Sequence, residues 1–208
     1  MGSPRSDIHD RVLNAASLDE IEQAYSEWAK DYDSDLVDLA GYVAPAICAD
    51  ALLEYLPDKS VSVLDAGCGT GLVGERLAEG GVALIDGLDY SADMLNMAAA
   101  KGCYAQLLRA DLNSHLDIPS DHYHASICVG TFTSGHVKPH ALHELLRVTR
   151  PGGPVCFTVR DSFWDASNFG ATLAELEETG SAMILSQSVV PYITSEGSES
   201  QRVILQRC

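Results

Sequence analysis

Three glycines at alternate positions follow a short apolar run and form the part of this chain best suited to holding a ligand. The segment reads VLDAGCGTG from Val63 to Gly71, with Asp65 two residues before the first glycine. Glycines let the chain turn tightly and let a ligand approach bare backbone. Asp89 ends a second apolar run, and its carboxylate can accept hydrogen bonds from ribose hydroxyls. This pairing predicts a site for an adenosine-bearing cofactor at the carboxyl end of a parallel sheet.

The same glycines fit two cofactor patterns. Gly69, Gly71 and Gly74 satisfy G-x-G-x-x-G, which is typical of nicotinamide and flavin enzymes. Read from Asp65, the run instead satisfies D-x-G-x-G-x-G, the pattern of S-adenosylmethionine enzymes. The Asp65 carboxylate would repel a pyrophosphate but suits a cationic aminoacyl group. Two predicted helices precede the glycines, and little chain follows to form the site of a hydride acceptor. These features favour S-adenosylmethionine and leave an NAD-dependent oxidoreductase as an alternative.

Strands and helices alternate around these residues, which predicts an α/β, doubly wound, Rossmann-like fold. We expect a mostly parallel sheet of about seven strands, closed by a C-terminal antiparallel hairpin and preceded by N-terminal lid helices. The expected strands are 62–66, 83–88, 105–109, 125–129 and 155–159, and the hairpin strands are 183–192 and 202–206. The expected helices are 18–32, 43–55, 71–79, 92–100, 139–149 and 170–179.

Length and composition predict one domain. At 208 residues the chain can bury a sizeable core without disulfides or metals. We divide it into N-terminal helices (1–57), a cofactor-binding core (58–160) and a C-terminal helix with a hairpin (161–208). Neither repeats nor low-complexity tracts are evident.

Charge and cysteine usage limit the partners and the location. The net charge is −17, with 13 basic against 30 acidic residues, so the chain would repel a nucleic-acid backbone. Six scattered cysteines without a C-x-x-C pair favour a reducing compartment and disfavour zinc. The polar amino terminus lacks a secretory pattern, and no apolar run reaches the roughly twenty residues of a membrane span. We therefore expect a cytoplasmic protein that binds neither nucleic acid nor membrane.

Four motifs together resemble those of the class I S-adenosylmethionine-dependent methyltransferases. They are VLDAGCGTG, GLDYS, RADL (Arg109 to Leu112) and LLRVTRPGG (Leu145 to Gly153), in that family's order and spacing. YSEWAKDYD (Tyr25 to Asp33) also resembles an element of many small-molecule methyltransferases. More narrowly, GTFTSGHVKPHALHELLRVTRPGG is similar to the methyltransferase-like proteins of the Williams–Beuren syndrome chromosomal region.

The resemblance assigns the aminoacyl and ribose parts of S-adenosylmethionine. The backbone of Gly67, Cys68 and Gly69 would pass under the methionine portion, where side chains would collide with it. Asp65 would orient that loop or meet the cofactor's ammonium group. Asp89 would accept hydrogen bonds from both ribose hydroxyls.

The resemblance also assigns residues to the adenine and methyl ends of the cofactor. Tyr90 and Met94 would sandwich adenine, although Met94 at helical spacing also fits a core position. Asp111 would accept a hydrogen bond from the adenine amino group, and the Leu112 backbone N–H would serve a ring nitrogen. The methyl-bearing sulfur would face Val129 and Gly130 at the end of the fourth strand.

Three aromatic residues share one predicted helical face: Tyr25, Trp28 and Tyr32. A core-packing stripe would explain them. In the family that this chain resembles, such a helix forms a lid over the cofactor, and an aromatic face suits a sulfonium cation. We expect the lid.

His136, His140 and His143 lie in one region at spacings that could reach one helical face. Pro139 interrupts that face, so we expect no metal site. His136 follows the fourth strand, at the rim where a substrate would enter, and is our candidate general base.

The expected activity is transfer of a methyl group from S-adenosylmethionine to an N, O, S or C nucleophile of a small molecule, releasing S-adenosylhomocysteine. Polar and aromatic residues in loops 131–138 and 162–168 favour a small organic acceptor. The alternative is a cofactor-binding but catalytically silent interaction module, since this chemistry has no obligate catalytic residue.

Overall fold

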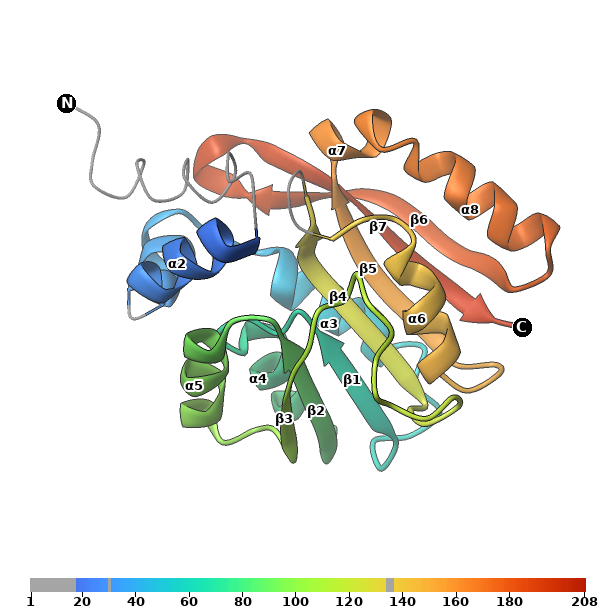
Figure 1. The fold of residues 1–208 in the computed structure, drawn as a ribbon, viewed down its shortest axis with the longest axis horizontal. Coiled ribbons are helices and arrows are strands. Elements are labelled where there is room, and N and C mark those ends of the chain that lie inside the picture. The colour runs from blue at the N-terminus through green and yellow to red at the C-terminus, as the bar shows by residue number, and fades with distance from the viewer. Residues whose placement is uncertain (1–17, 30, 134–136) are drawn as a thin grey trace.

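A seven-stranded sheet forms the centre of the computed structural model, which describes residues 18–29, 31–133 and 137–208 (Figure 1). The strand order is β3-β2-β1-β4-β5-β7-β6. Strands β1 to β5 pair in parallel, whereas β7 pairs antiparallel with both β5 and β6. The predicted doubly wound sheet with a closing antiparallel hairpin is therefore confirmed. The strands are β1 (Ser62–Ala66), β2 (Leu84–Asp89), β3 (Gln106–Arg109), β4 (Ala125–Phe132), β5 (Pro154–Arg160), β6 (Ala182–Ile193) and β7 (Ser198–Arg207).

Helices cover both faces of this sheet. The α-helices are α2 (Leu18–Trp28), α3 (Ala44–Leu53), α4 (Leu72–Glu79), α5 (Ala92–Lys101), α6 (Ala141–Val148), α7 (Asp161–Ala166) and α8 (Phe169–Glu178). A π-helix, η1 (Ser34–Leu39), and a 3-10 turn, η2 (Thr194–Glu196), complete the described elements.

Alternating apolar residues in the strands build two cores. Val63 packs with α3 and α4 on one face of the sheet, while the next residue, Leu64, packs with α6 and α8 on the other. Val155 and Cys156 divide between the two faces in the same way. A sheet buried on both faces leaves its strand ends as the place for a site (Figure 1).

The predicted helix over 18–32 differs from the structure. Helix α2 ends at Trp28, the chain turns, and the π-helix η1 begins at Ser34. The turn holds because the Asp31 N–H donates to the Trp28 carbonyl at 3.0 Å and the Ser34 hydroxyl donates to the Asp31 carbonyl at 2.9 Å. Asp and Ser compete with helical hydrogen bonds in this way.

Two further differences concern the end of one strand and the presence of one helix. Strand β4 continues past the predicted end at Val129 to Phe132, so Gly130 lies inside it. Helix α7 was not expected. In the part of the chain that the structure describes, no helix is long and apolar enough to cross a membrane.

Candidate active site

A pocket opens where the carboxyl ends of the parallel strands meet. Strand β1 lies between β2 and β4, so the strand order reverses here, which is the usual ligand site of an open α/β sheet. The pocket encloses about 790 Å³ of space, part of it open to solvent. Its described lining consists of Tyr32, Tyr42, Gly67, Gly69, Asp89, Tyr90, Ser91, Met94, Ala110, Asp111, Leu112, Asn113, Val129, Gly130, Thr131 and Val137.

The glycine loop between β1 and α4 presents bare backbone to this pocket. The N–H groups of Gly67 and Cys68 both donate to the Leu88 carbonyl, at 2.7 and 2.9 Å, which ties the loop to the end of β2. Gly67 and Gly69 have φ of +74° and +53°. A β-carbon added at Gly67 would lie 2.4 Å from the Thr131 hydroxyl, whereas one at Gly69 would meet nothing within 4 Å. The backbone at Gly69 therefore faces open space of the kind that a bound ligand fills.

Asp89 lies beside this loop at the end of β2. Its carboxylate accepts hydrogen bonds from the N–H of Gly69 at 2.8 Å and from the N–H of Ser91 at 2.9 Å. Burial nevertheless raises the pKa of Asp89 above its usual value. A carboxylate has about four lone-pair positions, so about two remain for a pair of ligand hydroxyls.

The opposite end of the pocket is formed by α5 and the loop that follows β3. Met94 is 2% exposed yet also lines the pocket, so it serves both as a core residue and as part of the wall. The Arg109 guanidinium lies 5.6 Å from the centre of the Tyr90 ring, and Arg109 Nε donates to the Tyr90 carbonyl at 2.9 Å. Asp111 Oδ1 accepts from the Asn113 N–H at 2.8 Å, which holds the carboxylate in a local turn.

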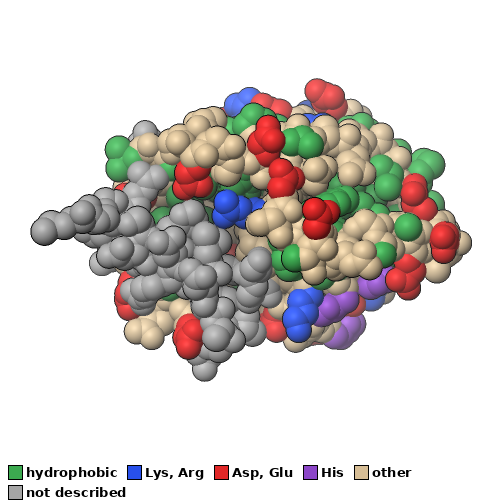
Figure 2. Space-filling view, turned by 90° about the horizontal axis from the view of Figure 1, so that it is seen from above, with side chains coloured by type: hydrophobic (Ala, Val, Ile, Leu, Met, Phe, Trp, Pro, Cys, Tyr) green, Lys and Arg blue, Asp and Glu red, His purple; other side chains and the backbone are tan. Residues whose placement is uncertain are grey.

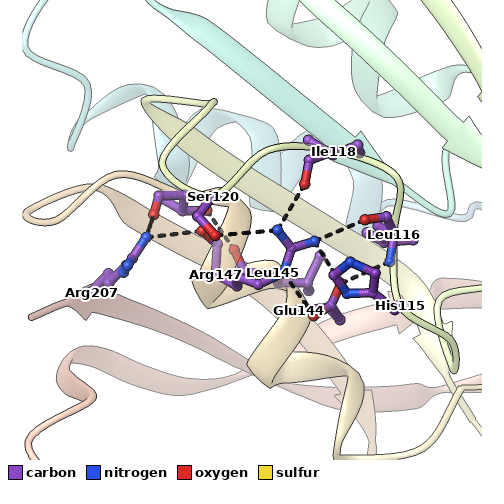
Figure 3. Close-up of polar contacts among 9 residues, drawn as sticks. His115, Leu116, Ile118, Ser120, Glu144, Leu145, Arg147 and Arg207 are labelled. Atoms are coloured by element: carbon purple, nitrogen blue, oxygen red, sulfur yellow. Dashed lines mark hydrogen bonds and ion pairs between the residues drawn. The ribbon is translucent and has the colours of Figure 1, made fainter.

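An ion pair on α6 fastens the rest of the loop between β3 and β4 (Figure 3). Arg147 and Glu144 are joined by two hydrogen bonds, of 2.8 and 2.7 Å. Arg147 also donates to the loop carbonyls of Leu116 at 3.0 Å and Ile118 at 2.7 Å, and Glu144 accepts from the Leu116 N–H at 2.8 Å. These bonds, chiefly those from Arg147, lower the pKa of Glu144 to about 2. Sequence reasoning missed this network, which joins residues about thirty positions apart.

Three of the predicted residues lie behind the pocket wall. Asp65 is 1% exposed, and the Tyr104 hydroxyl donates to its Oδ2 at 2.6 Å; burial raises the pKa of Asp65 to about 7. The Cys68 side chain is also buried. Trp28 packs in the core, and its indole N–H donates to Asp35 at 2.9 Å. The burial of Trp28 agrees with the core-packing alternative, and its contact with the cofactor stays a prediction.

Of the other predicted lid residues, Tyr32 reaches the pocket from the turn after α2, with its ring centre 4.7 Å from that of Trp28. The side chain of Tyr25 and all of His136 lie outside the described residues. Among the residues that the structure describes, no three His, Cys, Asp or Glu side chains are grouped to hold a metal ion.

Six lining residues were not among the individually predicted site residues, although two of them, Thr131 and Val137, lie in the loop 131–138 that we expected to contact the substrate. Ser91 had a signal, because it follows GLDY and its hydroxyl accepts from the Met94 N–H at the start of α5. Tyr42 had none, because it reaches the pocket through tertiary packing. The full set is Tyr42, Ser91, Ala110, Asn113, Thr131 and Val137.

Acidic side chains outnumber basic ones on the face seen in Figure 2, the upper side of the view in Figure 1. This agrees with the net charge of −17. The described lining of the pocket includes no lysine or arginine.

Residues 63–153 match the model of a family described as a methyltransferase domain. Human methyltransferase-like protein 27 is 36% identical over 191 residues, which cover 86% of this chain and 76% of the human protein. Malonyl-[acyl-carrier protein] O-methyltransferase of Erwinia pyrifoliae is 38% identical over 117 residues, covering 53% of this chain and 42% of that enzyme. The 18S rRNA (guanine-N(7))-methyltransferase RID2 of Arabidopsis thaliana is 43% identical over 70 residues, covering 33% of this chain and 24% of that protein.

A solved structure, that of the [4+2]-cyclase SpnF, superposes on this chain with a TM-score of 0.70. The match covers 94% of this chain and 98% of the cyclase, at 17% identity. It shows a shared fold and carries no information on the reaction.

The human relative matches across most of both chains, and the sheet order and the glycine loop agree with the motifs read from the sequence. S-adenosylmethionine is therefore the cofactor, and the nicotinamide alternative is set aside. This chain belongs to the class I S-adenosylmethionine-dependent methyltransferase family.

Proposed function

We propose that this methyltransferase acts on a small organic molecule that enters the pocket beside the end of β4. The observation that carries the proposal is the lining: Tyr32, Tyr42, Val129 and Val137 supply aromatic and apolar surface, and Thr131 a polar group. Apolar walls with a few placed polar groups are typical of small-molecule sites. A nucleic-acid substrate would instead require cations around the pocket.

We infer the following roles toward the cofactor, which supplies an activated methyl group on a sulfonium. The backbone from Gly67 to Gly69 would hold the aminoacyl chain, and Asp89 would accept from the ribose hydroxyls. Positions at the end of β4 would face the methyl group. The protein's contribution is alignment of the acceptor and exclusion of water. The adenine end would be held by Tyr90, Met94, Asp111 and Leu112.

The name of one relative supports a small acceptor group, whereas the name of another points to RNA. The Erwinia relative is named for an O-methylation of a malonyl group, a small carboxylic acid on a carrier protein. The Arabidopsis relative is named for an rRNA guanine, but that match covers only a third of this chain. A test must therefore include RNA.

The test uses S-adenosylmethionine labelled at the methyl group, incubated with the full chain and, separately, a small-metabolite extract, total RNA and cellular protein. We expect label in the small-molecule fraction and none in RNA, with label lost in an Asp89→Ala variant. Label confined to RNA or protein would contradict the proposal. Cofactor binding without label in any fraction would favour the silent module.

A further inference from the structure

Two buried tyrosines meet at the end of β4. Tyr42 precedes α3 and Tyr192 lies near the end of β6, and they are 8% and 7% exposed. Their ring centres are 4.9 Å apart and their hydroxyl oxygens 3.4 Å apart. The backbone holds the pair, because the Val43 N–H donates to the Tyr192 carbonyl at 3.1 Å and Tyr42 forms a bridge with Ile193.

Both hydroxyls point at Gly130. A β-carbon added there would lie 2.3 Å from the Tyr42 hydroxyl and 3.0 Å from the Tyr192 hydroxyl. Gly130 has φ of +75° and is anchored by donating to the Thr158 hydroxyl at 2.9 Å. The two phenols thus occupy the space of a side chain at a position that lines the pocket.

The two phenols carry one more O–H donor than the hydrogen bond between them uses. Each phenol carries one O–H donor, and one hydrogen bond joins the two hydroxyls. That bond is long at 3.4 Å, and among the described residues neither hydroxyl has another hydrogen-bond partner. One donor therefore remains for an outside acceptor. Tyr42 donates the bond between the two hydroxyls, so the remaining O–H belongs to Tyr192. The Tyr192 hydroxyl lies beside Gly130, which lines the pocket, so an occupant of the pocket can supply the acceptor.

The charge around the pair favours an electron-rich group. Burial raises the pKa of both Tyr42 and Tyr192, so the phenols stay protonated at neutral pH and act as donors rather than as bases. The Arg160 guanidinium, at the end of β5, lies 5.1 Å from the centre of the Tyr192 ring. Within the described chain it has no carboxylate partner, although the protein is strongly acidic. This places a cation beside the Tyr192 ring, while the Glu196 carboxylate also acts on the Tyr192 hydroxyl and contributes to its raised pKa.

We propose that the Tyr42–Tyr192 pair, with Arg160 behind it, binds a carboxylate oxygen of the methyl acceptor through the spare phenolic donor. The inference rests on the proposed function, since it identifies the acceptor as a carboxylic acid. Tyr192 contacts the acceptor, and Tyr42 and Arg160 act through Tyr192 as positioning residues, Tyr42 by donating to its hydroxyl and Arg160 from beside its ring. A neutral phenolic donor gains most from a charged oxygen, because such hydrogen bonds are roughly twice as strong as neutral ones.

The main competitor for the same donor is the cofactor's own carboxylate. The two cases separate experimentally, because one changes the affinity for S-adenosylhomocysteine and the other changes the KM for the acceptor. Tyr42→Phe and Tyr192→Phe remove one hydroxyl each and keep the rings. Tyr55→Phe is the matched control, since Tyr55 is 38% exposed and outside the pocket.

The experiment first measures the Kd of S-adenosylhomocysteine for the full chain and each variant. It then measures transfer of labelled methyl to probe carboxylic acids and to primary amines of the same carbon skeleton. We expect turnover of acids, with KM raised at least tenfold in Tyr192→Phe and the Kd of the product within twofold of the unmodified chain. Arg160 is partly exposed, so its substitution disturbs the core less than that of a buried tyrosine. Arg160→Gln should raise the KM for acids, and this result can be measured even if a tyrosine variant fails to fold.

Three results would overturn the inference without contradicting the proposed function. They are a tenfold weaker Kd for S-adenosylhomocysteine in Tyr192→Phe, turnover of amines alone, and equal behaviour of Tyr192→Phe and Tyr55→Phe. No turnover of acids by a chain that binds the product would also overturn it. Transfer of label only to RNA or protein would instead contradict the proposed function itself.

Discussion

Gly67 and Gly69 share a left-handed backbone but have different surroundings. An alanine at either position incurs a similar backbone strain of roughly 1–2 kcal/mol. The β-carbon at Gly67 would collide with Thr131, while the one at Gly69 would enter open space in the pocket. The difference between the two substitutions therefore reports on what occupies that space.

We predict that Gly67→Ala lowers the melting temperature more than Gly69→Ala does. Gly69→Ala should instead weaken S-adenosylhomocysteine binding at least about tenfold, because its methyl group would occupy the path of the aminoacyl chain. Thermal unfolding and calorimetric titration of both variants measure the two effects. A Gly69→Ala variant that binds like the unmodified chain would show that the cofactor does not cross this residue.

Asp89 lines the pocket with a carboxylate held by the backbone N–H groups of Gly69 and Ser91. Asp89→Ala should weaken binding of S-adenosylhomocysteine at least about tenfold, or about 1.4 kcal/mol, because ribose hydroxyls would lose a charged acceptor. Asp117→Ala, at an exposed carboxylate, is the control and should bind normally. An unchanged Kd for Asp89→Ala would refute the ribose assignment.

The residues that the sequence placed in the pocket are those whose position follows from a strand end and a turn. Gly67 and Gly69 lie in the turn after β1, and Asp89 is the last residue of β2, so the short-range pattern of the sequence was enough. Tyr42 was not predictable, because it reaches Gly130 only through pairing with β6, which lies 150 residues away at Tyr192. Trp28 shows the limit of helical spacing, which fits a lid residue and a core residue equally well; in the structure its side chain is buried.

At the scale of elements, α6 and the loop after β3 depend on one ion pair. Glu144 ionises with a pKa of about 2 because Arg147 and the Leu116 N–H stabilise its charged form. A carboxylate with a lowered pKa in the folded state stabilises the fold above its ordinary pKa of about 4.5. That contribution is lost as pH falls from there toward 2.

We predict that Glu144→Gln lowers the free energy of unfolding at neutral pH by roughly 1–3 kcal/mol, because Arg147 loses a charged partner. The gap to the unmodified chain should close as pH falls from about 4.5 toward 2. Denaturant unfolding of both chains across this pH range measures the difference in their free energies of unfolding. Glu79→Gln, which breaks an exposed pair with Arg76, should change stability little; a gap that persists at low pH would contradict the assignment.

Element prediction succeeded where the pattern was strong and failed where local chemistry competed. Apolar runs between glycine-rich turns predicted the positions of the strands and the closing hairpin, whereas the order of the strands in the sheet came from the structure. The stretch from Asp31 to Asp35 broke the predicted N-terminal helix, because its acidic and serine side chains favour turns. Strand β4 ran past the expected end because its pairing with β5 resumes at Phe132, after a register shift beside the left-handed Gly130.

For the whole molecule, the dominant feature is a net charge of −17. Like charges spread over one domain repel one another and oppose the compact state. The acidic face in Figure 2 belongs to this pattern. We expect the same charge to oppose the approach of polyanions, with Arg160 as a local cation.

We predict that the melting temperature rises by a few degrees between about 0.05 M and about 0.5 M sodium chloride, since the Debye length shrinks over this range. Potassium chloride should raise the melting temperature by a similar amount, because the effect comes from screening of the protein's charges by salt. Thermal unfolding in a salt series measures it. A melting temperature that falls with salt would show that specific ion pairs outweigh the general repulsion.

The account depends most on the claim that the pocket at the β1–β4 junction binds S-adenosylmethionine. Calorimetric titration of S-adenosylmethionine, S-adenosylhomocysteine and NADH into the full chain tests it directly. We predict that both adenosyl compounds bind with one site per chain and that NADH does not bind. Absence of binding by either adenosyl compound at millimolar concentration, or binding of NADH in their place, would contradict it.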